Sequence, residues 1–330
     1  MGIKEVARQA GVSVATVSYY INGTKNVSPQ SSEKIQRAIE ETGYRPNLVA
    51  RGLRTNENKM IAVLVQDITS GYYNDVLEGI AKVLNQHDYG VSLCITWSNP
   101  EYELRDFQQM IARQASGVIM TPINSDCDFR ALCPRPDFPI VFMDRLQTGT
   151  EADVALCDNY AITYRTVGQM IEKGYRRIAY FYSASLDNVS TTKDRLNAYQ
   201  NALRDRGIEV QRDRIVFSRD PADSYALMEK LYAGKEKPDA IFIASSQMSF
   251  GVLRYVQDHR LSVPRDVALV NFDDYEWADI TAPTPLTTIR QPANELGRAA
   301  AKLMLERIQN PDSAYRTIML DSQLIERGSL

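Results

Sequence analysis

Short apolar stripes open the chain in a pattern typical of three small helices. The first predicted helix covers residues 4–10, and after a glycine turn the second covers 14–22, with Ser13 as its N-cap. A third helix is predicted from Ser28, followed by a proline at the first helical position, to Gly43. The spacing of the first two helices matches a helix-turn-helix, whose second helix enters the major groove of DNA.

From Met60 the pattern changes to continuous apolar runs of strand length that alternate with helical stretches. Strands are expected at 60–68, 90–97, 117–123, 139–146, 177–183, 214–217, 240–245 and 267–274. Helices are expected between them at 74–87, 101–115, 161–173, 195–206, 223–233 and 248–258. This alternation indicates parallel sheets covered on both faces, in two lobes. Ligands bind beyond the carboxyl ends of such strands, so we expect a cleft between the lobes.

A polar segment over residues 44–59 separates the two patterns. Pro46 and Asn47 interrupt regular structure, and a short helical fragment follows that contains Gly52. Glycine inside a helix costs about 1 kcal/mol relative to alanine, and isolated helices of this length are marginal in water. The segment is therefore predicted to be a linker that folds conditionally.

Length, composition and charge refine this picture. A chain of 330 residues favours two or three domains, and 44% apolar with 24% charged residues is typical of a folded, soluble protein. No apolar run is long enough for a membrane helix and no secretory signal is visible, so we expect a cytoplasmic protein without a membrane partner. The net charge is +4 over residues 1–59 and −7 over the remainder, which favours a polyanionic partner for the first segment.

The sequence offers little for metal or enzyme chemistry. Four cysteines show no C-x-x-C pair and only two histidines are present, so we expect reduced thiols and no metal site. The chain contains no G-x-S-x-G, P-loop or G-x-G-x-x-G motif. We therefore expect no enzymatic activity, no catalytic residues and no cofactor.

The stretch "IKEVARQAGVSVATVSYYINGTKNVS", followed by "GYRPNLVARGLR", closely resembles the N-terminal DNA-binding domain of the LacI/GalR family of bacterial transcriptional regulators. The resemblance continues through "VALCDNYAITYRTVGQMIEKGYRRIAY" and "VPRDVALVNFDDYEWADITAPTPLTTIRQP" and covers essentially the whole chain. It implies an α/β fold: an all-α helix-turn-helix headpiece with a hinge helix, and a two-lobed core like periplasmic sugar-binding proteins. The expected boundaries are 1–58 for the headpiece, with the hinge helix at about 47–54, and 59–330 for the core. Within the core we expect one lobe at about 60–159 and 290–320 and the other at about 160–289 and 321–330.

Carried over residue by residue, the resemblance places Val14, Ala15 and Tyr19 where the recognition helix meets base edges. Other matched positions contact the DNA backbone or hold the helix, namely Ser13, Thr16, Ser18 and Asn22. Asn47 and Arg51, in the segment that leads to the core, are also expected to bind DNA. Many members carry arginine at position 19, so the operator sequence is open, and packing of Tyr19 on a sugar-phosphate edge is the alternative. Leu53 matches the leucine that the hinge helix wedges into the minor groove; the alternative is a plain linker residue.

Another set of matched positions implies a small-molecule effector in the cleft. The matched positions are Tyr72, Tyr73, Asp144, Thr191, Arg195, Ser245 and Asp273, and Arg219 aligns roughly where some members have an aromatic residue. Trp97 and Trp277 are added because one ends a predicted strand and the other follows Asp273-Asp274. Carboxylates, arginines and aromatic faces of this kind suit a sugar. If Arg195 and Arg219 both face inward, an acidic or phosphorylated sugar is the alternative. Where the family commonly has Asn-Asp, this chain has Ser245-Ser246, so the particular sugar cannot be inferred by analogy.

Each effector position also has a structural explanation. Arg195 could be a surface charge and the Tyr72-Tyr73 pair could fill the core. Asp273-Asp274 could cap a strand end, and the two tryptophans could belong to core or rim.

These features predict a DNA-binding transcriptional regulator, most simply a repressor of carbohydrate-utilisation genes controlled by a sugar-like effector. A homodimer is expected, because two headpieces on a two-fold axis read a pseudo-palindromic operator in double-stranded DNA. A phosphorylated carrier protein is a further partner known in the family. One alternative is a sugar-binding protein without a regulatory role, which would need a signal peptide and no headpiece. Another is an enzyme on an α/β scaffold.

Overall fold

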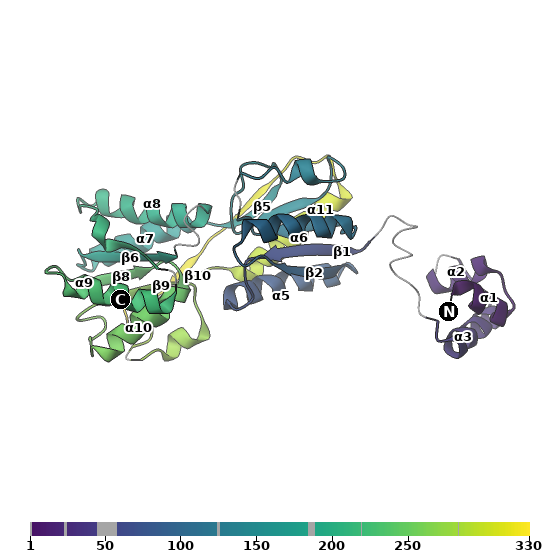
Figure 1. Cartoon of the computed structure of the whole chain (residues 1–330), viewed down its shortest axis with the longest axis horizontal. Helices are drawn as coiled ribbons and strands as arrows, with labels where there is room; N and C mark the ends of the chain where they lie inside the picture. Colours follow the sequence, from purple (N-terminus) through teal and green to yellow (C-terminus); the bar gives the residue numbers. More distant parts are fainter. Residues whose placement is uncertain are drawn as a thin grey trace. The chain divides into compact units, whose positions relative to one another are not determined.

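We analysed a computed structural model of the chain that describes residues 2–22, 25–44, 58–123, 126–183, 189–218, 220–282 and 284–330. The chain divides into two compact units, Met1–Lys59 and Met60–Leu330 (Figure 1). Over the described residues, no helix combines the length and apolar character that crossing a bilayer requires.

The described residues of the first unit form three helices: α1 (Ile3–Ala10), α2 (Val14–Asn22) and α3 (Pro29–Thr42). The predicted caps are confirmed, because Ser13 Oγ accepts the N–H of Thr16 at 3.1 Å and Ser28 Oγ accepts the N–H of Ser31 at 3.3 Å. Gly43 ends α3 with φ +62°, a backbone conformation that favours glycine. The apolar stripes of the helices meet in one small core, centred on Val6, Val17, Ile35 and Ala38.

The second unit is built on two six-stranded sheets, which we call the N-lobe sheet and the C-lobe sheet. The N-lobe sheet is entirely parallel with strand order β11-β5-β4-β3-β1-β2. The C-lobe sheet has the order β12-β10-β9-β8-β6-β7 and is parallel except for the antiparallel pair of β10 with β12. The fold class expected from the sequence is confirmed. The strands are β1 (Met60–Val65), β2 (Gly90–Ile95), β3 (Gly117–Met120), β4 (Ile140–Met143), β5 (Asp153–Cys157), β6 (Ile178–Ser183), β7 (Ile215–Ser218), β8 (Ala240–Ile243), β9 (Ala268–Phe272), β10 (Thr287–Arg290), β11 (Thr317–Leu320) and β12 (Gln323–Ile325).

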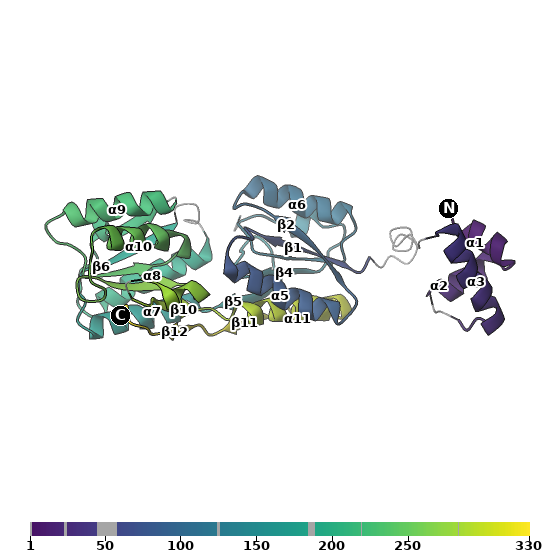
Figure 2. The same ribbon diagram turned by 90° about the horizontal axis from the view of Figure 1, so that it is seen from below.

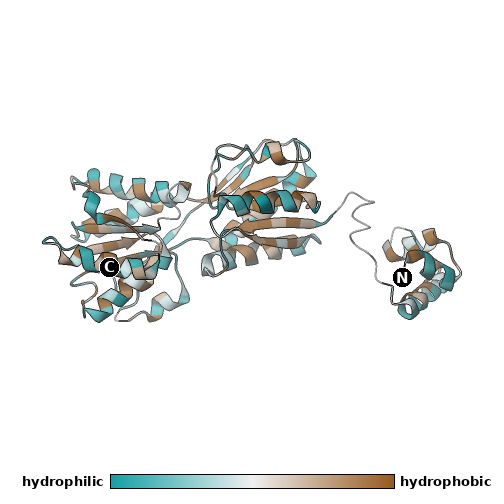
Figure 3. Ribbon diagram, viewed as in Figure 1, coloured by the Kyte–Doolittle hydropathy of each residue, from teal (hydrophilic) through white to brown (hydrophobic). Residues whose placement is uncertain are grey.

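Helices cover both faces of each sheet, which is why most strands are hydrophobic along their length (Figure 3). On the N-lobe sheet, α6 packs on one face and α5 with α11 on the other (Figure 2). On the C-lobe sheet, α7 and α8 cover one face and α9 and α10 the other. The helices are α5 (Gly71–Asn85), α6 (Pro100–Ala112), α7 (Asn159–Glu172), α8 (Ser190–Arg204), α9 (Pro221–Ala233), α10 (Ser249–Asp258) and α11 (Ala293–Gln309).

The chain passes between the lobes three times: between β5 and α7, between β10 and α11, and between β11 and β12. Each lobe is therefore completed by segments far apart in the sequence. In the N-lobe, α5 and α11 approach so closely that a Cβ on Gly79 would overlap the backbone carbonyl of Asn294, and one on Gly297 would overlap that of Val76. Glycine at both positions lets the two helices pack backbone to backbone.

Candidate functional site

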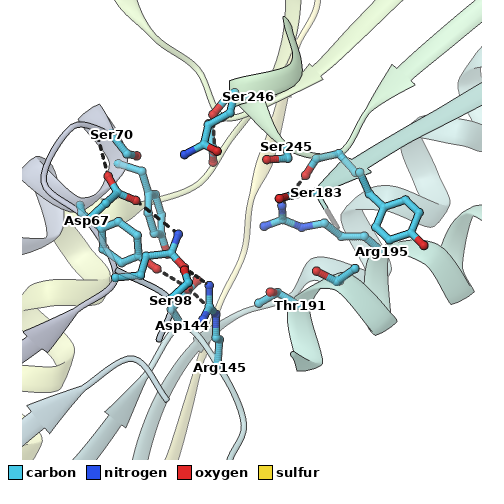
Figure 4. Close-up of a pocket in the computed structure, with 18 of the residues that line it drawn as sticks. Asp67, Ser70, Ser98, Asp144, Arg145, Ser183, Thr191, Arg195, Ser245 and Ser246 are labelled. Carbon is cyan, nitrogen blue, oxygen red and sulfur yellow. Dashed lines mark hydrogen bonds and ion pairs between the residues drawn. The ribbon is translucent and has the colours of Figure 1, made fainter. Parts of the chain in front are cut away.

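A cavity of about 270 Å³ lies between the lobes (Figure 4). Many of its lining residues directly follow strands: Gln66 and Asp67 follow β1, Asp144 and Arg145 follow β4, Ala244 and Ser245 follow β8, and Asp273 follows β9. The carboxyl ends of parallel strands in both sheets thus converge on one space, which is the arrangement expected for a ligand site.

The N-lobe wall is organised around Asp144. The hydroxyls of Tyr72 and Tyr73, both buried in the first turn of α5, donate to its two carboxylate oxygens at 2.9 Å and 3.2 Å. Burial, reinforced by the negative charge of Asp144, raises the pKa of both tyrosine hydroxyls. They therefore remain protonated donors and fix the carboxylate in one orientation.

Arg145 lines the same wall, although the sequence analysis did not select it. Its side chain is only 2% exposed, and its Nε lies 3.7 Å from the nearer Asp144 oxygen. Its Nη2 donates to Gln66 Oε1, while its Nε has no hydrogen-bond partner among the described residues. Its position directly after Asp144, at the carboxyl end of a predicted strand, is the sequence signal that could have identified it as a cavity residue.

The C-lobe wall is organised around Arg195 on α8. Its Nε donates to Asn159 Oδ1 and its Nη1 to the carbonyl of Ala244, both at 2.7 Å. The guanidinium carbon lies 3.4 Å from the centre of the Phe272 ring. These contacts use two of the five N–H donors and direct the guanidinium into the cavity (Figure 4).

The adjacent carboxylates Asp273 and Asp274 have different surroundings. Asp273 lines the cavity and accepts from Gln291 Nε2 at 2.7 Å; burial raises its pKa, and the positive charge of Arg195 offsets part of that rise. Asp274 is not among the lining residues, and it accepts from Arg290 Nε at 2.8 Å and Arg327 Nη1 at 2.9 Å. Only the first carboxylate is therefore available to a ligand.

The structure brings eight of the ten expected effector residues to the cavity wall: Tyr72, Tyr73, Trp97, Asp144, Thr191, Arg195, Ser245 and Asp273. Trp97 is 58% exposed, in keeping with a position at the rim. Arg219 lies outside the described residues. Trp277 does not line this cavity, because its ring stacks on Tyr275 at a centroid distance of 5.7 Å and contacts Phe250 at 5.2 Å.

Tyr180 is a lining residue that sequence reasoning missed. It sits within β6 among core residues, and its hydroxyl is buried without a hydrogen-bond partner among the described residues. Nothing in an apolar strand such as "RIAYFYS" distinguishes a tyrosine at a cavity from one in the core.

In the first unit, the start of α2 is accessible. Ser13, Val14 and Ala15 are exposed, and Val14 retains 41% of its surface. Thr16 and Ser18 are half-buried, and Asn22 is the last residue of α2. Tyr19 is half-buried, with Lys25 Nζ 4.8 Å from its ring centre. Asn47, Arg51 and Leu53 lie outside the described residues.

Comparison with known proteins gives two family matches. Residues 2–47 match the model described as bacterial regulatory proteins, lacI family, and residues 167–330 match a periplasmic binding protein-like domain. The chain is 29% identical to the HTH-type transcriptional repressor PurR of Vibrio atlanticus, covering 99% of this chain and 98% of that protein. It is 31% identical to the ribose operon repressor of Haemophilus influenzae, with the same coverage.

Solved structures give the same result. The structure of the transcriptional regulator CelR in complex with cellobiose aligns with 100% of this chain over 99% of its own length, with a TM-score of 0.74 and 26% sequence identity. The lac repressor dimer bound to operator covers 100% and 98%, with a TM-score of 0.85 and 22% identity, and so shows the likeness of fold.

Proposed function

Since this chain is a DNA-binding transcriptional regulator of the LacI family, we propose that a small carbohydrate in the interlobe cavity controls its affinity for operator DNA. The observation that carries this proposal is the meeting of Asp144, Arg195 and Asp273, from two lobes, in one polar cavity. Carboxylates accept sugar hydroxyl protons and a guanidinium donates to sugar oxygens.

The proposed mechanism follows from the position of the cavity. A ligand that contacts both walls stabilises one relative arrangement of the lobes more than others. In a homodimer on a pseudo-palindromic operator, that arrangement sets the spacing of the two headpieces. A coupling of about 1–3 kcal/mol changes operator affinity roughly 5–150-fold, which is sufficient for a switch.

We propose repression as the outcome, because PurR and the ribose operon protein are both described as repressors. A phosphorylated carrier protein remains a predicted additional partner. Residues 13–19 are proposed to read DNA, with Val14 and Ala15 offering apolar contacts to thymine methyl groups.

Two measurements on the full chain test this function. Gel-shift affinity for an operator fragment should fall as salt rises, because bound phosphates release counterions. A thermal-shift screen of sugars, sugar acids, sugar phosphates and purine bases should reveal the effector, since a ligand at 100 times its Kd stabilises by about 2.7 kcal/mol. Stabilisation by purine bases alone would contradict the carbohydrate assignment. Equal affinity for all duplexes, whatever compound is added, would contradict the regulatory role.

A further inference from the structure

Tyr275, in the loop after β9 of the C-lobe, connects the two lobes at the cavity edge. Its hydroxyl lies 3.3 Å from Ser70 Oγ of the N-lobe and 3.1 Å from Ser246 Oγ of the C-lobe. Both serines line the cavity and lie on the same side of it (Figure 4). One phenol hydroxyl therefore joins two lining residues that come from opposite lobes.

The hydroxyl of Ser70 is not used to cap α5, although Ser70 occupies the N-cap position of that helix. Asp67 fixes the turn that precedes α5, since its Oδ1 accepts the backbone N–H of Thr69 at 3.0 Å and that of Ser70 at 2.9 Å. The Ser70 hydroxyl is thus directed across the lobe boundary.

The aromatic ring of Tyr275 also fits closely against the N-lobe. A Cβ on Gly71 would lie 2.9 Å from two carbons of that ring, closer than real Cβ contacts. The ring also stacks on Trp277 with planes 17° apart, and Trp277 packs against Phe250. The Tyr275 ring therefore contacts both the first residue of α5 and an aromatic cluster of the C-lobe.

We propose that Tyr275, which does not itself line the cavity, is a latch between the lobes that holds the lining residues Ser70 and Ser246 together, so that the effector is limited to a single sugar ring. The size limit rests on the proposed carbohydrate function, whereas the latch itself does not. A cavity of about 270 Å³ is slightly smaller than the roughly 300–1,000 Å³ typical of ligand sites. A second ring extending toward Ser70 and Ser246 would have to displace the Tyr275 hydroxyl from both.

The latch is tested without any ligand by hydrogen exchange on the full-length protein. Tyr275→Phe removes the hydroxyl and keeps the ring, while Gly71→Ala adds a methyl group that the ring must avoid. Both should accelerate amide exchange in peptides covering residues 66–73 and 273–277 by roughly fivefold, the effect of losing about one hydrogen bond. Tyr164→Phe is the matched control, because the Tyr164 hydroxyl donates to the exposed Asp205 at 2.9 Å, within the C-lobe. Exchange that matches wild type in both latch variants would overturn the latch.

The size limit is tested by thermal shift with matched pairs: glucose against cellobiose, and galactose against lactose. We expect the wild type to be stabilised by single-ring sugars only. In Tyr275→Ala, the affinity for a disaccharide relative to that for the matching monosaccharide should rise by roughly tenfold. Wild-type binding of a disaccharide as tight as that of its monosaccharide would overturn the size limit. Absence of stabilisation by every sugar, including sugar acids and phosphates, would instead overturn the carbohydrate assignment and with it the size limit, while the exchange experiment still decides the latch.

Discussion

Individual residues around the cavity are oriented by unusual backbone conformations. Four lining residues have positive φ: Trp97 (+53°), Ser98 (+54°), Asp144 (+67°) and Asp273 (+74°). Such conformations are unfavourable for residues with a Cβ and cluster at functional sites. Each follows the end of a strand, where a change of backbone direction turns the side chain into the space between the lobes.

Arg195 is expected to carry the ligand response. Arg195→Ala removes the guanidinium that points into the cavity, so effector affinity should fall roughly 10–100-fold, the range for a charged hydrogen bond. Operator affinity without effector should stay unchanged, as measured by gel shift. Arg204→Ala provides the control, because Arg204 lies on the exposed side of the same helix. A normal ligand response in Arg195→Ala would mean that the effector binds elsewhere.

Asp274 is expected to stabilise the fold in a pH-dependent way. Burial alone would raise its pKa, but hydrogen bonds from Thr288, Arg327 and Arg290 outweigh burial and hold the pKa below its ordinary value. Because the pKa is lower in the folded than in the unfolded protein, the ionised carboxylate adds to the free energy of unfolding. This contribution is complete at pH values above the unfolded-state pKa of about 3.9, and it is lost as the pH falls through the folded-state pKa. Asp274→Asn should therefore lower the free energy of unfolding by about 2–3 kcal/mol at pH 7. In urea titrations this difference should narrow below pH ~4; a constant difference would refute the assignment.

At the scale of elements, the sequence correctly predicts the helices whose ends are set by local signals such as a capping serine or a glycine. Ser13, Ser28 and Gly43 act through bonds within one helical turn, so the bounds of α1 to α3 follow from spacing alone. The strands β5, β10, β11 and β12 were not predicted, and their formation depends on pairing with strands far away in the sequence. Asp153 at the start of β5, for example, is buried because it pairs with Arg307 at 2.8 Å.

The candidate site divides in the same way. The alternation of strands and helices predicted a cleft at the carboxyl ends of the strands, and the family resemblance placed Asp144 and Asp273 in it; both residues line the cavity. Trp277 was misplaced, because three residues of loop turn it onto Tyr275 instead. Arg145 also follows a strand end and could have been selected by that rule, whereas Tyr180 lies within β6 and lines the cavity through packing that no local pattern encodes.

The two helix caps give a matched pair of substitutions. Ser13→Ala and Ser28→Ala each remove an N-cap bond worth about 1 kcal/mol, so amide exchange in α2 or α3 of the full chain should accelerate roughly fivefold. Only Ser13 lies at the start of the helix predicted to enter the major groove. Gel-shift affinity should therefore fall further for Ser13→Ala, and equal losses would argue against that placement.

At the scale of the whole molecule, regulation requires the effector core and the DNA-binding unit to communicate. Leu53 is predicted to wedge into the minor groove, so Leu53→Ala should weaken binding to the specific operator about tenfold or more. Affinity for unrelated duplexes and the thermal shift given by the effector should both remain at wild-type values. Unchanged operator affinity would remove the wedge role from Leu53.

The three passages of the chain between the lobes affect how the protein is made. The sheet that contains β1 lacks α11 and the edge strand β11 until residues 293–320 have been synthesised. Since α5 is shaped by Gly79 to receive α11, a nascent chain on the ribosome exposes that apolar helix face while the C-lobe segments are still being translated. The first unit has its own apolar core, formed by residues 3–44, and we expect it to fold before the core that binds the effector is complete.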